Sequence, residues 1–77
     1  MKEKITNILK DINPYETITE NTDLIADEVL DSVSIMLLIT NLESEFHISV
    51  NFNDIVLDNF RNVDSIVDLV EKSKKVD

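Results

Sequence analysis

The chain has 77 residues, a net charge of −9, and neither cysteine nor glycine. A chain of this length forms one domain, so we expect residues 1–77 to fold as a single unit. Without cysteine there are no disulfides or thiolate zinc sites, and one histidine cannot build a histidine-rich metal site, so no metal is expected. Without glycine, phosphate-binding Gly-rich loops are excluded, and tight turns are expected to use asparagine, aspartate and Pro14.

The N-terminal residues 1–5 include two lysines but no apolar stretch follows them, so no signal peptide is expected. No segment approaches the length that crosses a bilayer. The sequence therefore predicts a soluble, cytoplasmic domain that does not insert into membranes.

Charge is distributed unevenly along the chain. All seven basic residues lie towards the two ends, whereas the stretch from Asp11 to Phe60 contains eleven acids and no lysine or arginine. A surface of one sign repels nucleic acid and anionic lipid and attracts basic proteins. The alternative is that the acids only keep a small protein soluble and monomeric.

Residues 2–12 carry apolar side chains at helical spacing, and Asn13-Pro14 ends the predicted helix. A long connection, residues 13–30, follows, and connections of this length are usually functional or contain a short turn of structure. We expect its apolar residues to be buried anchors: Tyr15, Ile18, Leu24, Ile25 and Leu30.

A second helix is predicted over residues 32–46, followed by an extended segment at 47–50 and a short helix at 52–57. The single histidine, His47, is expected only to end the second helix. Asn62 is a plausible N-cap for a last helix, which begins at Val63. Three longer helices and one short one predict an all-α four-helix bundle with a long loop between its first two helices.

The second helix has two apolar faces rather than one. Its expected core face contains Ile35, Leu38, Ile39, Leu42 and Phe46, and a second patch lies on the other side of the helix. This patch either packs against the long connection or docks partner proteins. It consists of Val33, Met36, Leu37 and Thr40.

The tripeptide Leu30-Asp31-Ser32 lies where the connection meets the second helix. His47 lies roughly 22 Å along the helix, and Asp31 does not face its neighbour, so Ser32 lacks a base and no catalytic residue is predicted. The dipeptide Asp31-Ser32 is alternatively an ordinary N-cap. A phosphate on Ser32 would nevertheless lie at the positive end of the helix dipole, which suits an attachment site.

Leu30-Asp31-Ser32-Val33, followed by an apolar helix that closes in Glu43-Ser44-Glu45-Phe46, resembles the acyl carrier protein family. Further similarities lie at Asp23-Leu24, at Ile48-Ser49-Val50 and at residues 60–66. The resemblance implies a non-catalytic carrier domain over 1–77, with 4′-phosphopantetheine bound covalently to Ser32.

Two departures indicate a subtype. Val29 stands where fatty-acid-type carriers usually have glycine, and Met36 and Leu37 occupy a helix side that is acidic in those carriers. With Phe60, the pattern looks closer to D-alanyl carrier proteins and aminoacyl (peptidyl) carrier domains. This favours a carrier that is dedicated to one pathway and loaded by an adenylating ligase.

The resemblance implies that a phosphopantetheinyl transferase modifies Ser32 and that partner enzymes, including acyl-transfer or condensing enzymes, act on a bound thioester. Asp31, Asp27 and Glu28 are then expected to attract basic partners, and Val33, Met36, Leu37 and Thr40 to form the docking patch. The expected protein is a monomer that binds no nucleic acid. An alternative function is an acidic helical interaction module without a cofactor, which needs no hydroxyl at position 32.

Overall fold

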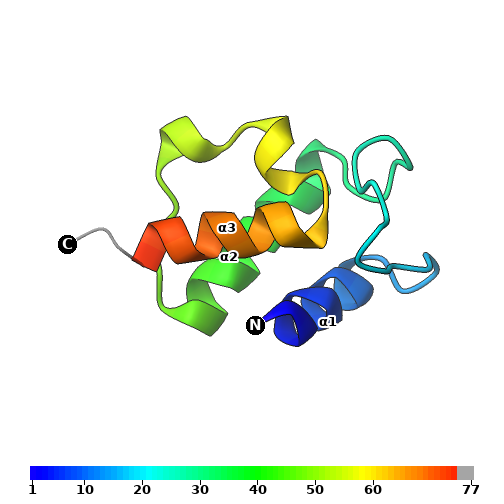
Figure 1. The fold of residues 1–77 in the computed structure, drawn as a ribbon, viewed down its shortest axis with the longest axis horizontal. Helices are drawn as coiled ribbons and strands as arrows, with labels where there is room; N and C mark the ends of the chain where they lie inside the picture. Colours follow the sequence, from blue (N-terminus) through cyan, green and yellow to red (C-terminus); the bar gives the residue numbers. More distant parts are fainter. Residues whose placement is uncertain (75–77) are drawn as a thin grey trace.

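The computed structural model describes residues 1–74 of the chain. It contains three α-helices, α1 (Lys2–Ile12), α2 (Ser32–Phe46) and α3 (Val63–Lys74), and two 3-10 turns, η1 (Phe52–Asp54) and η2 (Leu57–Phe60). Figure 1 shows α1 running in the direction opposite to α2 and α3. The all-α prediction is confirmed, and no strand occurs in residues 1–74. The place of the expected short helix at 52–57 is taken by the two 3-10 turns.

The helices pack through the apolar faces expected from the sequence. Helix α1 buries Ile5 and Leu9 and packs on both α2 and α3, while η2 packs on α3. The start of α3 is capped as predicted, because the Oδ1 atom of Asn62 accepts a 2.8 Å hydrogen bond from the backbone N–H of Ser65. The buried core therefore spans every helix and the connection. It contains Ile5, Leu9, Ile18, Leu24, Val29, Leu30, Ile35, Leu38, Ile39, Leu42, Val50, Phe60, Val63, Ile66, Leu69 and Val70.

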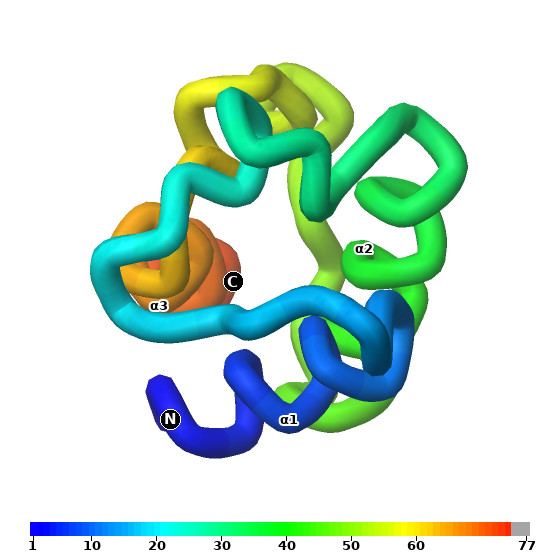
Figure 2. Tube along the Cα trace, turned by 90° about the vertical axis from the view of Figure 1, so that its right-hand side faces the viewer, coloured from blue at the N-terminus to red at the C-terminus, as the bar shows by residue number. Residues whose placement is uncertain are grey.

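The connection between α1 and α2 is tied to the core along its length. It loops across the end of the bundle where α3 begins (Figure 2). The backbone N–H of Leu24 donates to the carbonyl of Arg61 at 2.6 Å, and the N–H of Leu30 donates to the carbonyl of Leu24 at 2.9 Å. The side-chain amide of Asn13 donates to the carbonyl of Val29 at 3.3 Å. These bonds fix the chain immediately before α2.

Most of the predicted anchors in the connection are buried. Ile18, Leu24 and Leu30 belong to the core, and Ile25 is partly buried against it. The prediction for Tyr15 is wrong, because its side chain is 96 % exposed. Glu16 donates its backbone N–H to the carbonyl of Asn13, which closes a turn after α1 and leaves Tyr15 at the tip of that turn.

Two residues of the described chain adopt the left-handed backbone conformation, and neither is an asparagine or aspartate. Within residues 1–74 these are Glu28, with φ of 57°, and His47, with φ of 54°. Asn13, Pro14 and Asp23 do form turns as expected, but the two left-handed positions are taken by other residue types. At His47 the reason is the helix end: the N–H groups of His47 and Ile48 both donate to the carbonyl of Glu43, a geometry that needs a left-handed residue. His47 thus ends α2 as expected, and residues 48–51 follow outside any regular element.

The left-handed backbone at His47 makes glycine the better residue there. The His47→Gly variant is expected to raise the free energy of unfolding by about 1 kcal/mol, because glycine has no Cβ to clash in this conformation. Urea denaturation followed by circular dichroism measures the change. Ser49→Gly is the matched control and is expected to lower stability slightly through backbone entropy. An equal shift in both variants would contradict a strained His47.

Candidate functional site

Ser32 is the first residue of α2, and its side chain is exposed. The preceding residue, Asp31, has an extended backbone (φ −113°, ψ −175°), and its Oδ1 atom accepts a 2.8 Å hydrogen bond from the N–H of Ser34. Asp31 is therefore the N-cap, as one alternative from the sequence proposed. The cap holds the serine at the helix end where backbone N–H groups carry partial positive charge.

The residues that precede Ser32 also restrict its position. Val29 and Leu30 are 3 % and 5 % exposed, so the two residues that approach the site are held in the core. Upstream, the Oδ1 atom of Asp23 accepts hydrogen bonds from the N–H groups of Ile25 and Ala26, which organises a turn in the connection. A buried segment on one side and a capped helix on the other leave Ser32 little freedom to move.

Asp31 is held in its ionised form. The backbone N–H of Ser34 donates to its carboxylate and keeps the pKa of Asp31 below its ordinary value. The N–H of Ala26 has the same effect on the pKa of Asp23, assisted by the N–H of Ile25 and by Arg61. Both carboxylates are therefore charged at neutral pH, one next to Ser32 and one at the start of the turn that leads to it.

The lowered pKa of Asp31 makes the stability of the cap depend on pH. A depressed carboxyl pKa stabilises the fold above the unfolded-state pKa of about 3.9, and this stabilisation is lost as pH falls through the folded-state pKa. The Asp31→Asn variant keeps a good N-cap but cannot ionise. The difference in Tm between the wild type and Asp31→Asn is therefore expected to be largest above about pH 5 and to shrink below about pH 4.

Thermal unfolding at a series of pH values measures this difference. Asp27→Asn is the matched control, since it removes a neighbouring carboxylate that caps no helix. A Tm difference that grows as the pH falls would contradict the assigned cap.

The outer face of α2 is uncovered. Val33, Met36 and Leu37 are 70 %, 57 % and 51 % exposed, and Thr40 is exposed with its hydroxyl donating to the carbonyl of Met36 at 3.1 Å. The connection therefore does not pack on this face, and that alternative is wrong. The opposite face is buried as expected, through Ile35, Leu38, Ile39 and Leu42, with Phe46 partly buried.

A cleft of about 480 Å³ opens beside the serine, between the first turns of α2 and the segment that leads into η2. The sequence did not predict this second wall, because residues 52–57 were expected to form a short helix. A signal was present: three consecutive apolar residues, Ile55-Val56-Leu57, cannot all point into one core. Apart from that of the serine, the side chains that line the cleft are all apolar. It consists of Ser32, Ile35, Met36, Ile55, Val56, Leu57 and Phe60.

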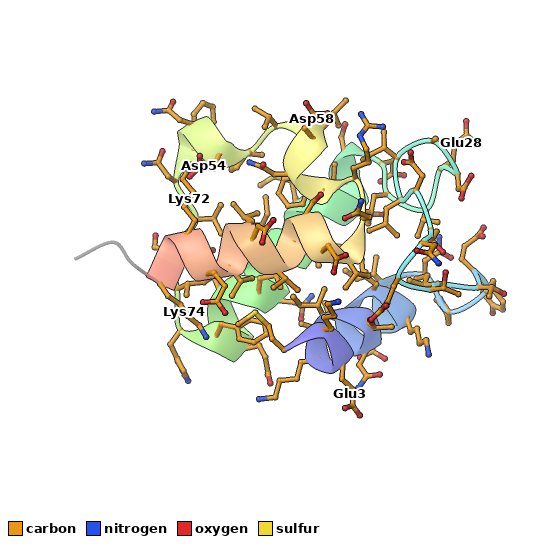
Figure 3. All side chains as sticks on the ribbon, viewed as in Figure 1. Glu3, Glu28, Asp54, Asp58, Lys72 and Lys74 are labelled. Carbon is orange, nitrogen blue, oxygen red and sulfur yellow. The ribbon has the colours of Figure 1, made fainter. Side chains whose placement is uncertain are left out.

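Folding changes the charge distribution that the sequence suggests. The basic residues from the two ends fold back onto acids in the middle of the chain, as in Lys2–Glu20, Lys4–Glu45 and Lys72–Asp54. Figure 3 shows the last of these pairs on the η1 side of α3. The middle of the chain is therefore not a uniform surface of one sign.

The acids that immediately precede Ser32 in the sequence are not among those paired with basic residues. Within the described part of the chain, Asp27, Glu28 and Asp31 form no ion pair, although Arg61 bridges Asp23 and Asp58 at 3.4 and 3.1 Å. All three are exposed, and Glu28 lies at the outer edge of the connection (Figure 3). We define these three exposed acids, which lie within the last five residues before α2, as the acidic rim.

Three further findings concern other possible functions. His47 ends α2 whereas Ser32 begins it, so the one imidazole lies at the far end of the helix from the hydroxyl. Among residues 1–74, no three His, Cys, Asp or Glu side chains are grouped to hold a metal ion. No helix in this range is long and apolar enough to cross a membrane.

A family model for the phosphopantetheine attachment site matches residues 3–70 of the chain. The chain belongs to this carrier family. No curated protein and no solved structure gives a significant match. The family fits the geometry, because a helix N-terminus beside an exposed hydroxyl suits a phosphodiester.

Membership in the phosphopantetheine attachment family establishes what kind of protein this is. It is a non-catalytic carrier that bears its substrates on a 4′-phosphopantetheine prosthetic group. Its partners include a phosphopantetheinyl transferase and enzymes that load or transfer the acyl group. Reactivity therefore comes from the prosthetic group and the partners, while the carrier presents the substrate.

Proposed function

We propose that this carrier bears phosphopantetheine on the Oγ atom of Ser32. The observation that supports this proposal is the exposed hydroxyl at the first residue of α2, next to a capping aspartate. The other serines of the helix are less suitable: Ser34 is half-buried, and Ser44 lies in the last turns. Only the position of Ser32 combines exposure with the positive end of the helix dipole.

Each neighbouring residue has a part in presenting the serine. When bound, the prosthetic group supplies a terminal thiol on which a substrate is held as a thioester. Asp31 fixes the first turn of α2 through its bond to Ser34, and the backbone N–H groups there stabilise a phosphodiester. Val29 and Leu30 anchor the approach, so the hydroxyl stays in one place while a transferase aligns coenzyme A with it.

The residues around Ser32 would meet the partner enzymes. We assign the acidic rim of Asp27, Glu28 and Asp31 to attracting basic partners, because none of the three is neutralised by an ion pair in the described chain. The docking patch, exposed beside Ser32, supplies the area that a partner covers. It consists of Val33, Met36, Leu37 and Thr40.

We also propose a subtype. The exposed Met36 and Leu37 on α2 and the buried Phe60 favour a carrier of the D-alanyl or aminoacyl type, loaded by an adenylating ligase, over a carrier for fatty acid synthesis. Residues 1–77 would form one carrier domain that acts as a monomer in the cytoplasm, a location that stays a prediction from the sequence. Incubation of the holo-protein with a panel of adenylating ligases, ATP and free D- and L-amino acids tests the subtype by mass.

The carrier function itself is tested by mass spectrometry. Incubating the wild-type protein with coenzyme A and a broad-specificity phosphopantetheinyl transferase is expected to add the mass of one phosphopantetheine. Fragmentation of the modified peptide is expected to locate this group on residue 32. A group found on another residue would contradict the assignment of Ser32. No added mass would instead favour a helical interaction module without a cofactor.

A further inference from the structure

Arg61, the only arginine in the chain, lies between η2 and α3 and joins two segments that are far apart in the sequence. Its Nη1 atom lies 3.4 Å from Oδ2 of Asp23, and its Nη2 atom donates a 3.1 Å hydrogen bond to Oδ1 of Asp58 in η2. We call residues 23–31, which lead into α2, the approach segment. Among the ion pairs of residues 1–74, only the one between Arg61 and Asp23 reaches this segment.

The backbone of Arg61 also contacts the approach segment. Its carbonyl accepts the N–H of Leu24 at 2.6 Å, and the carbonyl of Leu24 accepts the N–H of Leu30 at 2.9 Å. Leu30 is 5 % exposed and lies two residues before Ser32. A short series of hydrogen bonds therefore leads from Arg61 to the residue that precedes the cap of α2.

The guanidinium group of Arg61 restricts the carboxylate that organises the turn. Oδ2 of Asp23 faces Arg61, while Oδ1 of the same carboxylate accepts the N–H groups of Ile25 and Ala26. A carboxylate bonded through both oxygens cannot rotate freely, so the turn is held relative to the start of α3. Arginine suits this role because its rigid, planar fork offers each acid a separate nitrogen, whereas lysine has one point charge on a flexible stem.

The Arg61 bridge is too exposed to contribute much to overall stability. The side chains of Arg61 and Asp58 are 45 % and 85 % exposed, and exposed ion pairs contribute little to the free energy of unfolding. Its effect is therefore expected in the local order of the approach segment, because segments open locally at a lower cost than the whole fold. A reacting group that is displaced only slightly from its productive position reacts much more slowly.

We propose that Arg61 is a positioning residue for the attachment reaction, because its side chain holds the approach segment against η2 and thereby keeps the Ser32 hydroxyl in place. This inference rests on the proposed attachment at Ser32. In that reaction the Ser32 oxygen attacks the coenzyme A phosphorus that carries the pantetheine. The bond from this phosphorus to the bridging oxygen breaks, adenosine 3′,5′-bisphosphate leaves, and the serine proton passes to a base of the transferase. Arg61 acts through Asp23 and the turn.

The test compares two variants that each remove one positive charge. Arg61→Gln breaks the bridge to Asp23 and Asp58, whereas Lys72→Gln, the matched control, breaks the pair with Asp54. A more negative carrier attracts a basic enzyme more strongly, so KM is not expected to rise in either variant. With coenzyme A and a purified broad-specificity transferase, Arg61→Gln is expected to lower kcat by about threefold or more, and Lys72→Gln by less than about 1.5-fold.

Amide hydrogen exchange, measured without the enzyme, reports on the approach segment directly. The N–H groups of Leu24 and Leu30 are expected to exchange about fivefold faster in Arg61→Gln than in the wild type, and at the wild-type rate in Lys72→Gln. Arg61→Lys keeps a charge near Asp23 and is expected to restore part of both the protection and kcat. Equal kcat in Arg61→Gln and Lys72→Gln would overturn the positioning role. So would a lower kcat in Arg61→Gln with unchanged exchange at Leu30.

A milder variant keeps the test valid if circular dichroism shows that Arg61→Gln does not fold. Asp23→Asn retains an oxygen for the N–H groups of Ile25 and Ala26 but loses the charge that faces Arg61. It is expected to change kcat and amide exchange in the same direction by a smaller factor. Wild-type values of both quantities in Asp23→Asn would contradict the inference.

The mass of the product separates this inference from the proposed function. A wild-type protein that gains no phosphopantetheine, or gains it on a residue other than Ser32, would overturn both. Full modification at Ser32 with the same kcat in Arg61→Gln and Lys72→Gln would overturn only the positioning role of Arg61.

Discussion

The Ser32→Ala variant is expected to gain no phosphopantetheine under conditions in which the wild-type protein is fully modified. Alanine removes the only atom of residue 32 that can form the phosphodiester, and the neighbouring hydroxyl, that of Ser34, is half-buried. The fold is expected to tolerate this change, because Ser32 is exposed and alanine is the best helix former. The effect is therefore a complete loss of modification with a change in stability within about 0.5 kcal/mol.

Ser44→Ala is the matched control for this prediction. Ser44 is exposed on the same helix, but it lies in the C-terminal half, away from the helix N-terminus and the acidic rim. Intact-mass measurement after incubation with coenzyme A and the transferase is expected to show full modification of Ser44→Ala. Modification that persists in Ser32→Ala and disappears in Ser44→Ala would move the attachment residue to the other end of α2.

Helix boundaries are the part of this fold that the sequence predicts best. The limits of α2, Ser32–Phe46, agree with the prediction because strong local signals coincide there: an Asp N-cap, two apolar faces and a residue that closes the helix. The start of α3 was predictable from Asn62 for the same reason. These signals act between residues that are close in sequence, and a single chain displays them directly.

Features that depend on distant contacts could not be predicted in the same way. Nothing near Tyr15 in the sequence shows that the turn after α1 points its side chain into solvent. The left-handed backbone of Glu28 arises where the connection returns to the core, not from the preference of glutamate. Likewise, the bond between Leu24 and Arg61 joins residues that are far apart in the chain.

The candidate site shows the same division. Ser32, its cap and the exposed face of α2 follow from local sequence, because helical spacing fixes which side chains share a face. The cleft does not, because its second wall comes from residues 55–57, which line it together with Met36 only after the chain has folded and η2 has packed on α3. The local charges were also misleading, since lysines from both ends of the chain neutralise several of the central acids.

Phe60 connects the stability of the fold to the shape of the site. Its side chain is fully buried, and it lies in η2, which packs on α3 while also lining the cleft next to Ser32. The Phe60→Ala variant is expected to lose about 3–5 kcal/mol of unfolding free energy through lost burial and a new cavity. A small domain has only about 5 kcal/mol or slightly more to lose, so a large fraction of the variant would be unfolded.

Phe52 provides the matched control, because it is the same residue type in the neighbouring 3-10 turn but is 83 % exposed. The Phe52→Ala variant is expected to change the unfolding free energy by less than about 0.5 kcal/mol. Urea denaturation followed by circular dichroism measures both variants, with Phe60→Leu as a milder substitution that is expected to cost under about 1.5 kcal/mol. If Phe60→Ala were as stable as Phe52→Ala, η2 would not be held by the core. The wall of the cleft that η2 contributes beside Ser32 would then lack rigid support.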